Sequence, residues 1–405
     1  MQKKLSLIFL LSIFSFCTLS AETRKVEFSE KAYPDFSWDR VPVAMHLSKK
    51  TGDFTPDEVK FLAQADLIVI EKLQAGSKYN NAAKGAYVAT KAIKKENKDT
   101  KILFYWNSRI DFGRLYQKKH FHDDNPSWKL VDLKGEPIKV RGYEFVYDVT
   151  APGFIDWWVN YPNEAVDKQD MDGVFIDAVH QFFGTKDKYE KQLGVEKVAA
   201  TYAGVDEMVY QMGKNLSSKN KIFITNNCFP NRNHGQNLHN YSNGGMYEHF
   251  CNARTDDADK MVEQIATVQQ AAKAGGIVMV KCWPRYYFRR PELMQGHSKA
   301  QILANVREDI VFPLSCFLIA AEKYSYFMYS WGWTHSTGWL LDFPEYHRPL
   351  GQPLGDAVKD GYVYTRKYEH ADVWVDLQTK KGKIDWKLPV QSDKKSSKKT
   401  KKSKK

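Results

Sequence analysis

Short apolar segments recur along this 405-residue chain and alternate with stretches of helical pattern. In residues 67–70, 102–105 and 277–280, four consecutive side chains are hydrophobic. Continuous runs of this kind are typical of parallel strands that are buried on both faces of a sheet. The pattern predicts eight strands, at residues 41–46, 66–71, 101–107, 173–177, 221–226, 245–248, 276–282 and 324–329.

Helical stretches separate most of these strands. One begins at Thr55, a capping residue that is followed by Pro56 and by the acidic residues Asp57 and Glu58. Further helices are predicted at residues 82–96, 195–214, 256–273 and 299–321, whereas the step between the fifth and sixth strands has little helical pattern. Repeated strand–helix alternation predicts an α/β fold of the (β/α)8 or TIM barrel type, with a doubly wound parallel sheet as the alternative.

Two regions depart from the repeat. The connection after the third strand, residues 108–152, is far longer than an ordinary loop and leaves the end of the barrel where sites are built, so we expect it to shape a substrate site. Residues 361–366 and 371–377 alternate like an antiparallel hairpin. We therefore expect a barrel over residues 22–345, carrying the insert at 108–152, and a small C-terminal β appendage over residues 346–390.

The two ends of the chain have distinct compositions. Residues 1–21 read as a secretory signal, with Lys3 and Lys4 before a short apolar run and small residues up to Ala21. We expect an exported protein, periplasmic or extracellular, without an integral membrane span; lipoprotein anchoring through Cys17 is disfavoured by the bulky residues before it. Residues 391–405 form a Lys-rich tail that we expect to be disordered and able to contact anionic surfaces.

Most of the formal net charge of +12 sits in the signal and this tail, which leaves a nearly neutral body. The charge balance therefore argues against a nucleic-acid partner, because that requires basic residues arrayed on a folded surface. Four cysteines follow the signal, and three pairings of them stay open: Cys228, Cys251, Cys282 and Cys316. The spacing of His and Cys matches no metal motif, and we expect neither a metal nor a cofactor.

Catalytic groups of a parallel barrel emerge from the C-terminal ends of its strands. The polar and aromatic residues at the predicted strand ends are carboxylates, amides, histidines and tryptophans, a set that suits a carbohydrate partner. The candidates are His46, Glu71, Trp106, Asn107, Asp177, Asn226, Asn227, Glu248, Lys281, Trp283, Trp331, Trp333 and His335.

Hydrolysis of a glycosidic bond requires one carboxylic acid that protonates the leaving oxygen and one carboxylate on the other side of the ring. We nominate Asp177 and Glu248, because each ends a predicted strand, the first after an apolar run and the second after two glycines. The alternatives are a helix cap for Asp177 and a surface position for Glu248. Glu71 is the reserve candidate.

Tryptophan faces stack on sugar rings, so the four Trp candidates would serve as platforms and the polar candidates as ligands of sugar hydroxyls. Basic residues near the same rim suit sulfate or carboxylate groups of an anionic glycan, although a solvated surface is the alternative: Arg109, Lys281, Arg285, Arg289 and Arg290. A non-catalytic glycan-binding protein on the same scaffold remains the alternative function. A lyase or a metal-dependent deacetylase fits the residues less well.

Three segments resemble a group of hypothetical glycosyl hydrolase barrels that are distantly similar to α-galactosidase-type barrels and endo-fucanases. They are residues 172–177 (DGVFID), residues 128–153 with their Asp132-Leu133-Lys134-Gly135 and Tyr147-Asp148-Val149-Thr150 motifs, and residues 348–355 (RPLGQPLG). The resemblance implies a retaining mechanism in which Asp177 is the nucleophile and Glu248 the acid/base on the sixth strand. Related barrels often carry Asp at that second position.

Overall fold

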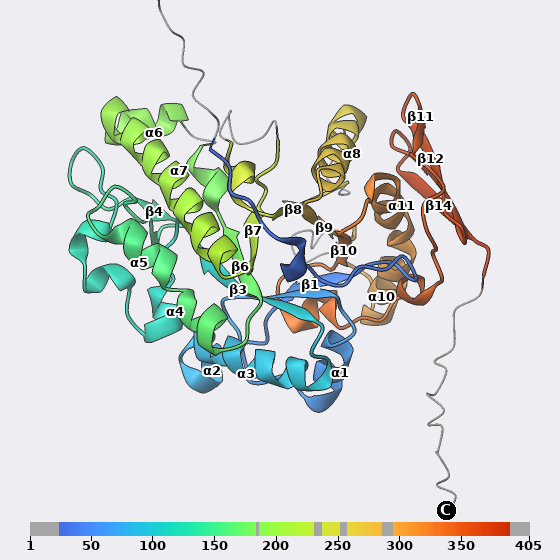
Figure 1. Ribbon diagram of the computed structural model, residues 1–405, viewed down its shortest axis with the longest axis horizontal. Helices are drawn as coiled ribbons and strands as arrows, with labels where there is room; N and C mark the ends of the chain where they lie inside the picture. Colours follow the sequence, from blue (N-terminus) through green and yellow to red (C-terminus); the bar gives the residue numbers. More distant parts are fainter. Residues whose placement is uncertain (1–23, 184–185, 231–236, 252–256, 286–294, 389–405) are drawn as a thin grey trace, which may run out of the picture.

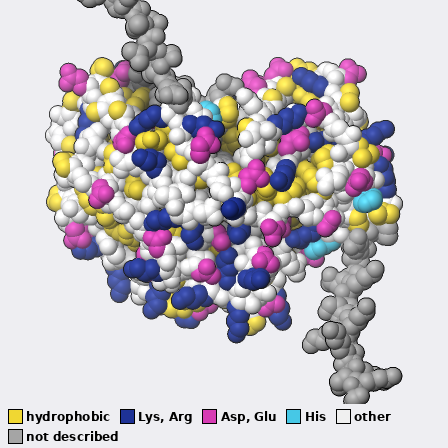
Figure 2. Space-filling model, in the orientation of Figure 1, with side chains coloured by type: hydrophobic (Ala, Val, Ile, Leu, Met, Phe, Trp, Pro, Cys, Tyr) yellow, Lys and Arg dark blue, Asp and Glu magenta, His cyan; other side chains and the backbone are white. Residues whose placement is uncertain are grey.

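The computed structural model describes residues 24–183, 186–230, 237–251, 257–285 and 295–388 (Figure 1). The expected signal at 1–21 and the Lys-rich tail at 391–405 lie outside these ranges, as do Arg289 and Arg290. Figure 2 shows basic and acidic side chains interspersed over one face, as expected for a nearly neutral body. Among the described residues, no helix is long and apolar enough to cross a membrane.

Eight parallel strands form one sheet whose order follows the chain, with each strand hydrogen-bonded to the next (Figure 1). Parallel bridges from Val43 to Phe327 and from Ser48 to Thr334 connect the last strand region to the first and bring the sheet round into a barrel. This arrangement confirms the predicted (β/α)8 fold. The strands are β1 (Ala44–Leu47), β2 (Leu67–Ile70), β3 (Lys101–Asn107), β6 (Gly173–Asp177), β7 (Ile222–Asn226), β8 (Gly244–Glu248), β9 (Ile277–Cys282) and β10 (Ser325–Tyr329).

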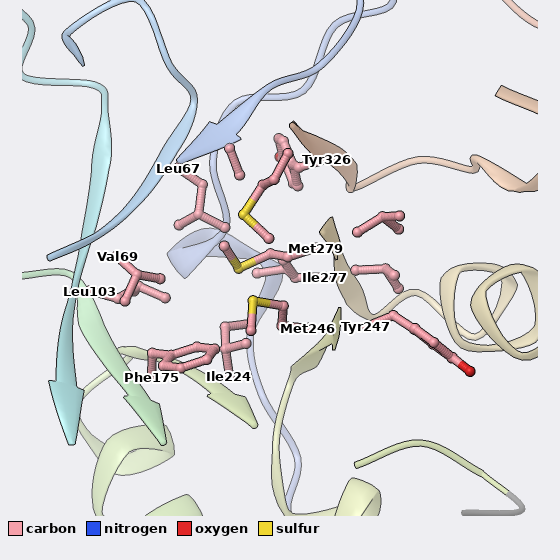
Figure 3. Close-up of a cluster of buried hydrophobic side chains, with 14 of the residues drawn as sticks. Leu67, Val69, Leu103, Phe175, Ile224, Met246, Tyr247, Ile277, Met279 and Tyr326 are labelled. Carbon is pink, nitrogen blue, oxygen red and sulfur yellow. The ribbon is translucent and has the colours of Figure 1, made fainter. Parts of the chain in front are cut away.

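The interior of the barrel is filled by every second side chain of each strand, because successive side chains of a strand point to opposite faces. Figure 3 shows these side chains meeting, with Phe175 of β6 and Met279 of β9 among them. Tyr247, next to the inward-pointing Met246, points out of the cluster. The same alternation decides which residues at the strand ends reach the mouth of the barrel.

Helices cover the outside of the barrel (Figure 1). The first begins as predicted, since Thr55 and Glu58 form a reciprocal capping box. Between β7 and β8 the described residues contain only a short 3-10 turn, Leu238–Tyr241, which agrees with the weak helical pattern there. The helices are α1 (Pro56–Leu62), α2 (Gly76–Tyr79), α3 (Ala82–Glu96), α4 (Gly113–Gln117), α5 (Phe154–Asn160), α6 (Lys186–Leu193), α7 (Val195–Ser218), α8 (Ala258–Lys273), α10 (Lys299–Asp309) and α11 (Val311–Ala320).

The prediction of one continuous helix over residues 299–321 was wrong. The chain forms α10 and α11 with a break at Ile310. Pro313 lies in the first turn of α11, where its missing N–H is tolerated, whereas inside a continuous helix it would lose a hydrogen bond and clash with the preceding turn.

The C-terminal appendage is a four-stranded antiparallel sheet that packs against α11 (Figure 1). Side chains of its third strand alternate between buried and half-buried, which confirms the predicted pattern. The fourth strand was missed because Lys381, Lys383 and Asp385 make it polar on one face. The strands are β11 (Val358–Asp360), β12 (Val363–Lys367), β13 (Ala371–Asp376) and β14 (Lys381–Trp386).

The insert after β3 contains α4, two 3-10 turns (Phe121–Asp123 and Pro126–Trp128) and a hairpin formed by β4 (Lys139–Val140) and β5 (Glu144–Phe145). It has a small core of its own, in which Leu130 and Val146 pack against Tyr189 and Leu193 of α6. The insert is therefore fixed to the barrel by apolar contacts as well as by the chain.

Gly173, the first residue of the fourth barrel strand, tests how closely the strands pack. A Cβ at this position would lie 2.0 Å from the backbone oxygen of Ile222, so Gly173→Ala must push β6 and β7 apart. We expect a loss of about 2 kcal/mol or more in the free energy of unfolding, measured by denaturant titration. Gly52→Ala is the control, since no atom lies within 4 Å of its Cβ; equal stability of the two variants would contradict the strand packing.

Candidate active site

A cleft of about 710 Å³ opens at the C-terminal ends of the barrel strands. Seven of the residues predicted from the sequence line it: His46, Glu71, Asp177, Asn226, Asn227, Glu248 and Trp333. A cavity of about 810 Å³ opens at the opposite end, next to residues such as Ala65 and Thr100 that precede strands. In TIM barrels that end serves stability, so the first cleft is the candidate active site.

One amide connects the two nominated carboxylates. Asn226 Nδ2 donates a hydrogen bond of 2.9 Å to Asp177 Oδ1 and another of 2.9 Å to Glu248 Oε2. These two oxygens therefore lie no farther apart than twice that length. The three residues end neighbouring strands, β6, β7 and β8, and each points inward in the alternation of its strand.

Asp177 is half-buried and held in its ionised form. Its Oδ2 accepts a 2.6 Å hydrogen bond from the Tyr105 hydroxyl, and its Oδ1 accepts one from the backbone N–H of Ala178. Burial acts to raise the pKa of Asp177, but the charge of Lys72 and the bonds from Asn226 and Tyr105 outweigh it, so the pKa lies below its usual value. This carboxylate stays negative at neutral pH.

Lys72 is the cation of the site, and the sequence analysis did not select it. Its ammonium forms an ion pair with the buried Glu71 and lies 4.5 Å from the centre of the Tyr105 ring. Lys72 and the backbone N–H of Leu73 both donate hydrogen bonds to the Glu71 carboxylate. Glu71 therefore holds Lys72 in place at the wall of the cleft.

Glu248 ends the sixth barrel strand and, like Asp177, is half-buried. The side chain of Asn227 accepts a 3.0 Å hydrogen bond from the backbone N–H of Glu248, which fixes the strand end. His249 Nε2 lies 3.5 Å from Glu248 Oε1. The sequence analysis missed the contribution of His249, which also stacks on Trp283.

His46 lies at the floor of the cleft, with its ring 4.6 Å from Trp333 and 4.8 Å from Phe175. Burial lowers the pKa of His46 to about 3, so the ring is neutral. Neither of its nitrogens has a hydrogen-bond partner among the described residues, and the same holds for Asn226 Oδ1. These buried polar atoms are suited to a substrate that brings hydroxyl groups.

Trp106 was expected at the rim, and the structure corrects this. It alternates with the inward-pointing Tyr105, so it faces the outer helices, where it stacks on Tyr161 at 4.3 Å and donates to the backbone oxygen of Trp158. A ring enclosed in this way presents no face to a ligand. Asn107 is also buried, and its amide donates to the Tyr105 hydroxyl instead of lining the cleft.

Lys281 and Trp283 are not among the residues that line the cleft. The Lys281 ammonium is fully buried, donates to the backbone oxygens of Cys282 and Ser330, and lies 3.9 Å from the Trp283 ring centre. Trp283 is buried edge-on against Trp333. Two further candidates are outside the cleft lining: Trp331, which packs on Gly338, and His335, which lies near Glu58 and Lys49.

The insert adds a residue that the sequence analysis overlooked. Arg141 lines the cleft from the tip of the β4–β5 hairpin. With φ of 53° at Arg141, 82° at Gly142 and a bond from Tyr143 N to Val140 O, this is a type I′ turn, which favours Asn or Gly at its first central position. Arginine there costs on the order of 1 kcal/mol, so its presence favours a function for the side chain.

Two other basic candidates, Arg109 and Arg285, already have partners, whereas Arg289 and Arg290 lie outside the described residues. Arg109 donates to Gln181 and Tyr189, and Arg285 forms an ion pair with Asp309. Cys228, Cys251, Cys282 and Cys316 are buried and form no disulfide in this structure.

Comparison with known proteins places the chain in a family of glycoside hydrolases. Residues 94–372, more than half of the chain, match hypothetical glycosyl hydrolase family 15. The chain belongs to this family and is, by that membership, a glycoside hydrolase. No curated protein matches it significantly.

Solved structures of glycosidases match the chain at low similarity. A maltogenic α-amylase from Thermotoga neapolitana is 10% identical with a TM-score of 0.46, and the match covers 83% of this chain and 85% of that one. A dextranase from Flavobacterium johnsoniae is 14% identical with a TM-score of 0.48, and the match covers 77% of this chain and 39% of that one. An α-galactosidase from Geobacillus stearothermophilus is 9% identical with a TM-score of 0.43, and the match covers 87% of this chain and 48% of that one.

The burial of Lys281 predicts a pH-dependent effect on stability. Burial lowers the pKa of Lys281 to about 7, well below that of a lysine in the unfolded chain. Below pH 7 the folded protein therefore carries the full energetic cost of the buried charge. This cost declines as the pH rises toward 10.5, because the folded protein then holds Lys281 neutral. We expect Lys281→Met to raise the melting temperature relative to wild type by several degrees more at pH 6 than at pH 10. A difference that is independent of pH would contradict this assignment.

Proposed function

We propose that this protein is an exported retaining glycoside hydrolase in which Asp177 is the nucleophile and Glu248 the acid/base. The observation that carries the proposal is the Asn226 amide, which bonds to both carboxylates and holds their nearest oxygens within twice 2.9 Å. Retaining enzymes separate their carboxyl groups by about 5–5.5 Å, whereas inverting enzymes need about 6.5–9.5 Å to admit a water. The shorter spacing favours retention.

The two environments divide the roles. Asp177 is ionised, so its Oδ2 attacks the anomeric carbon while protonated Glu248 gives its proton to the departing glycosidic oxygen. The ester formed on Asp177 is then hydrolysed by a water whose proton returns to Glu248. Glu248 lines the cleft and 18% of its side chain is exposed, so a leaving alcohol and an incoming water can reach it.

A non-catalytic glycan-binding role is the second candidate, and the same geometry argues against it. Binding sugar hydroxyls does not require two adjacent carboxylates, one of which is kept ionised inside the barrel against the cost of burial. His46 and Trp333 would serve either role. Export rests on the signal-like residues 1–21 alone.

Replacement of the nucleophile separates the two candidates. Asp177→Asn should lower kcat by at least about 10⁴-fold while the affinity for the glycan changes little, because the amide keeps the shape of the site but does not attack carbon. Release of reducing ends from a polysaccharide panel and isothermal calorimetry measure the two quantities. Asp99→Asn, at the opposite end of the barrel, is the matched control; unchanged turnover in Asp177→Asn would refute the proposed role.

We further propose that the substrate carries a sulfate or carboxylate group that contacts Arg141. Of the cationic side chains that line the cleft, Lys72 is paired with Glu71, whereas Arg141 reaches only Glu144, at 3.3 Å, from a largely exposed position. A guanidinium with free donors binds such anions through two hydrogen bonds.

Arg141→Asn tests the substrate class without a cost in folding. Asparagine is favoured at the first position of a type I′ turn, so the melting temperature should stay equal or rise. We expect KM for an anionic glycan to increase several-fold and that for its desulfated or neutral counterpart to stay unchanged. An equal loss on both substrates would contradict a charge-specific contact.

A further inference from the structure

A second group of reactive side chains lies within the insert, separate from the carboxylate pair. It consists of Asp111, His120 and His122, and one potential ligand atom from each lies within 4.8 Å of the others. The Asp111 carboxylate is fully buried, and the ring of His122 is nearly so. The proposed hydrolysis uses none of the three.

Asp111 is an ionised group without a full counter-charge. Burial acts to raise the pKa of Asp111, but hydrogen bonds from the His122 ring and from backbone N–H groups outweigh it and lower the pKa. Its oxygens accept bonds from the N–H of Gly113 at 2.7 Å, of Phe121 at 3.2 Å and of His122 at 3.1 Å. No Lys or Arg of the described ranges forms an ion pair with it, so only the two imidazoles face this charge.

His120 provides an independent observation. Its Nδ1 is buried and has no hydrogen-bond partner among the described residues. The distance to Asp111 Oδ1 is 3.7 Å, too long for a hydrogen bond, and the His120 ring stacks on that of His122 at 4.8 Å. Two stacked imidazoles, one of them with an unused nitrogen, therefore lie beside a buried carboxylate and together form a set of potential metal ligands.

We propose that Asp111, His120 and His122 bind a divalent transition-metal ion of the Zn²⁺ type. Two imidazole nitrogens and one carboxylate match the ligands of Zn²⁺, whereas Ca²⁺ and Mg²⁺ prefer oxygen ligands alone. An ion about 2.0–2.1 Å from each donor holds neighbouring donors roughly 3.3 Å apart. The carboxylate presents one oxygen to each ring: Asp111 Oδ1 lies 3.7 Å from His120 Nδ1, and Asp111 Oδ2 lies 2.7 Å from His122 Nδ1. These distances are within about 0.6 Å of the expected spacing, so small side-chain movements would complete the site.

The surroundings fit a structural metal. The ion replaces the proton between His122 Nδ1 and Asp111, and it gives the unused nitrogen of His120 a partner. The three backbone N–H groups keep the carboxylate oriented, as outer hydrogen bonds do in metal sites. Water completes the coordination from the side where the His120 ring is 15% exposed.

The position of the cluster connects it to the cleft. Phe145 of β5 packs edge-on against both imidazoles, at 5.1 Å and 4.7 Å, and its backbone oxygen accepts a bond from Asp111 N. The same hairpin carries Arg141 at its tip. A bound ion therefore stiffens the part of the insert that forms one wall of the active-site cleft.

Metal titration of the mature chain tests the proposal. After removal of metal with a chelator, we expect one equivalent of Zn²⁺ or Co²⁺ to bind and to raise the melting temperature, with Ca²⁺ giving neither effect. His120→Ala should abolish both while leaving the melting temperature of the metal-free protein nearly unchanged, because His120 makes no hydrogen bond to Asp111. His347→Ala, on the far side of the barrel, should bind like wild type.

Two outcomes would overturn the proposal: binding of one equivalent by His120→Ala as tightly as by wild type, or absence of binding below about 1 mM metal. The Co²⁺ spectrum identifies the ligands, since thiolate charge-transfer bands would assign the ion to the buried cysteines instead. Because binding is measured without substrate, the result is independent of the proposed hydrolysis.

Discussion

The pair of hydrogen bonds from Asn226 to Asp177 and Glu248 is the interaction on which the site depends. Two carboxylates at such a short distance repel each other. An amide NH2 group that bonds to both offsets part of that repulsion and fixes their spacing. The barrel makes this possible, because three neighbouring parallel strands end at the same edge with their last inward residues side by side. Tyr105 and Lys72 then keep Asp177 ionised in spite of its burial.

Most of the eight strands could be predicted from the sequence because they are apolar runs of the length of a buried strand, whereas β8 was predicted from its place in the repeat. Asp177, Asn226 and Glu248 were found by the same reasoning, as polar residues at strand ends. Trp106 was misplaced because strand ends were read without the two-residue alternation, which assigns opposite faces to Trp106 and Tyr105. That alternation was available in the sequence and would have selected Tyr105.

Other features depend on contacts that no local pattern encodes. Lys72 follows a strand and became part of the site only through its ion pair and its position over Tyr105. Arg141 lies in a hairpin far along the insert, and only its turn geometry and its place at the cleft reveal its importance. The insert is therefore the part of this glycoside hydrolase in which sequence reasoning was least informative. It carries both the proposed anion contact of Arg141 and the proposed metal site.

The most direct measurement is identification of the residue that becomes covalently attached to sugar. A fluorinated analogue of the substrate forms the glycosyl ester on the enzyme, and this ester hydrolyses only slowly. Proteolysis and mass spectrometry then identify the peptide that carries the sugar. The account predicts that the added mass lies on the peptide containing Asp177 and, within it, on that carboxylate. A label on Glu248 or Glu71, or turnover that produces the inverted anomer without any label, would contradict the assignment.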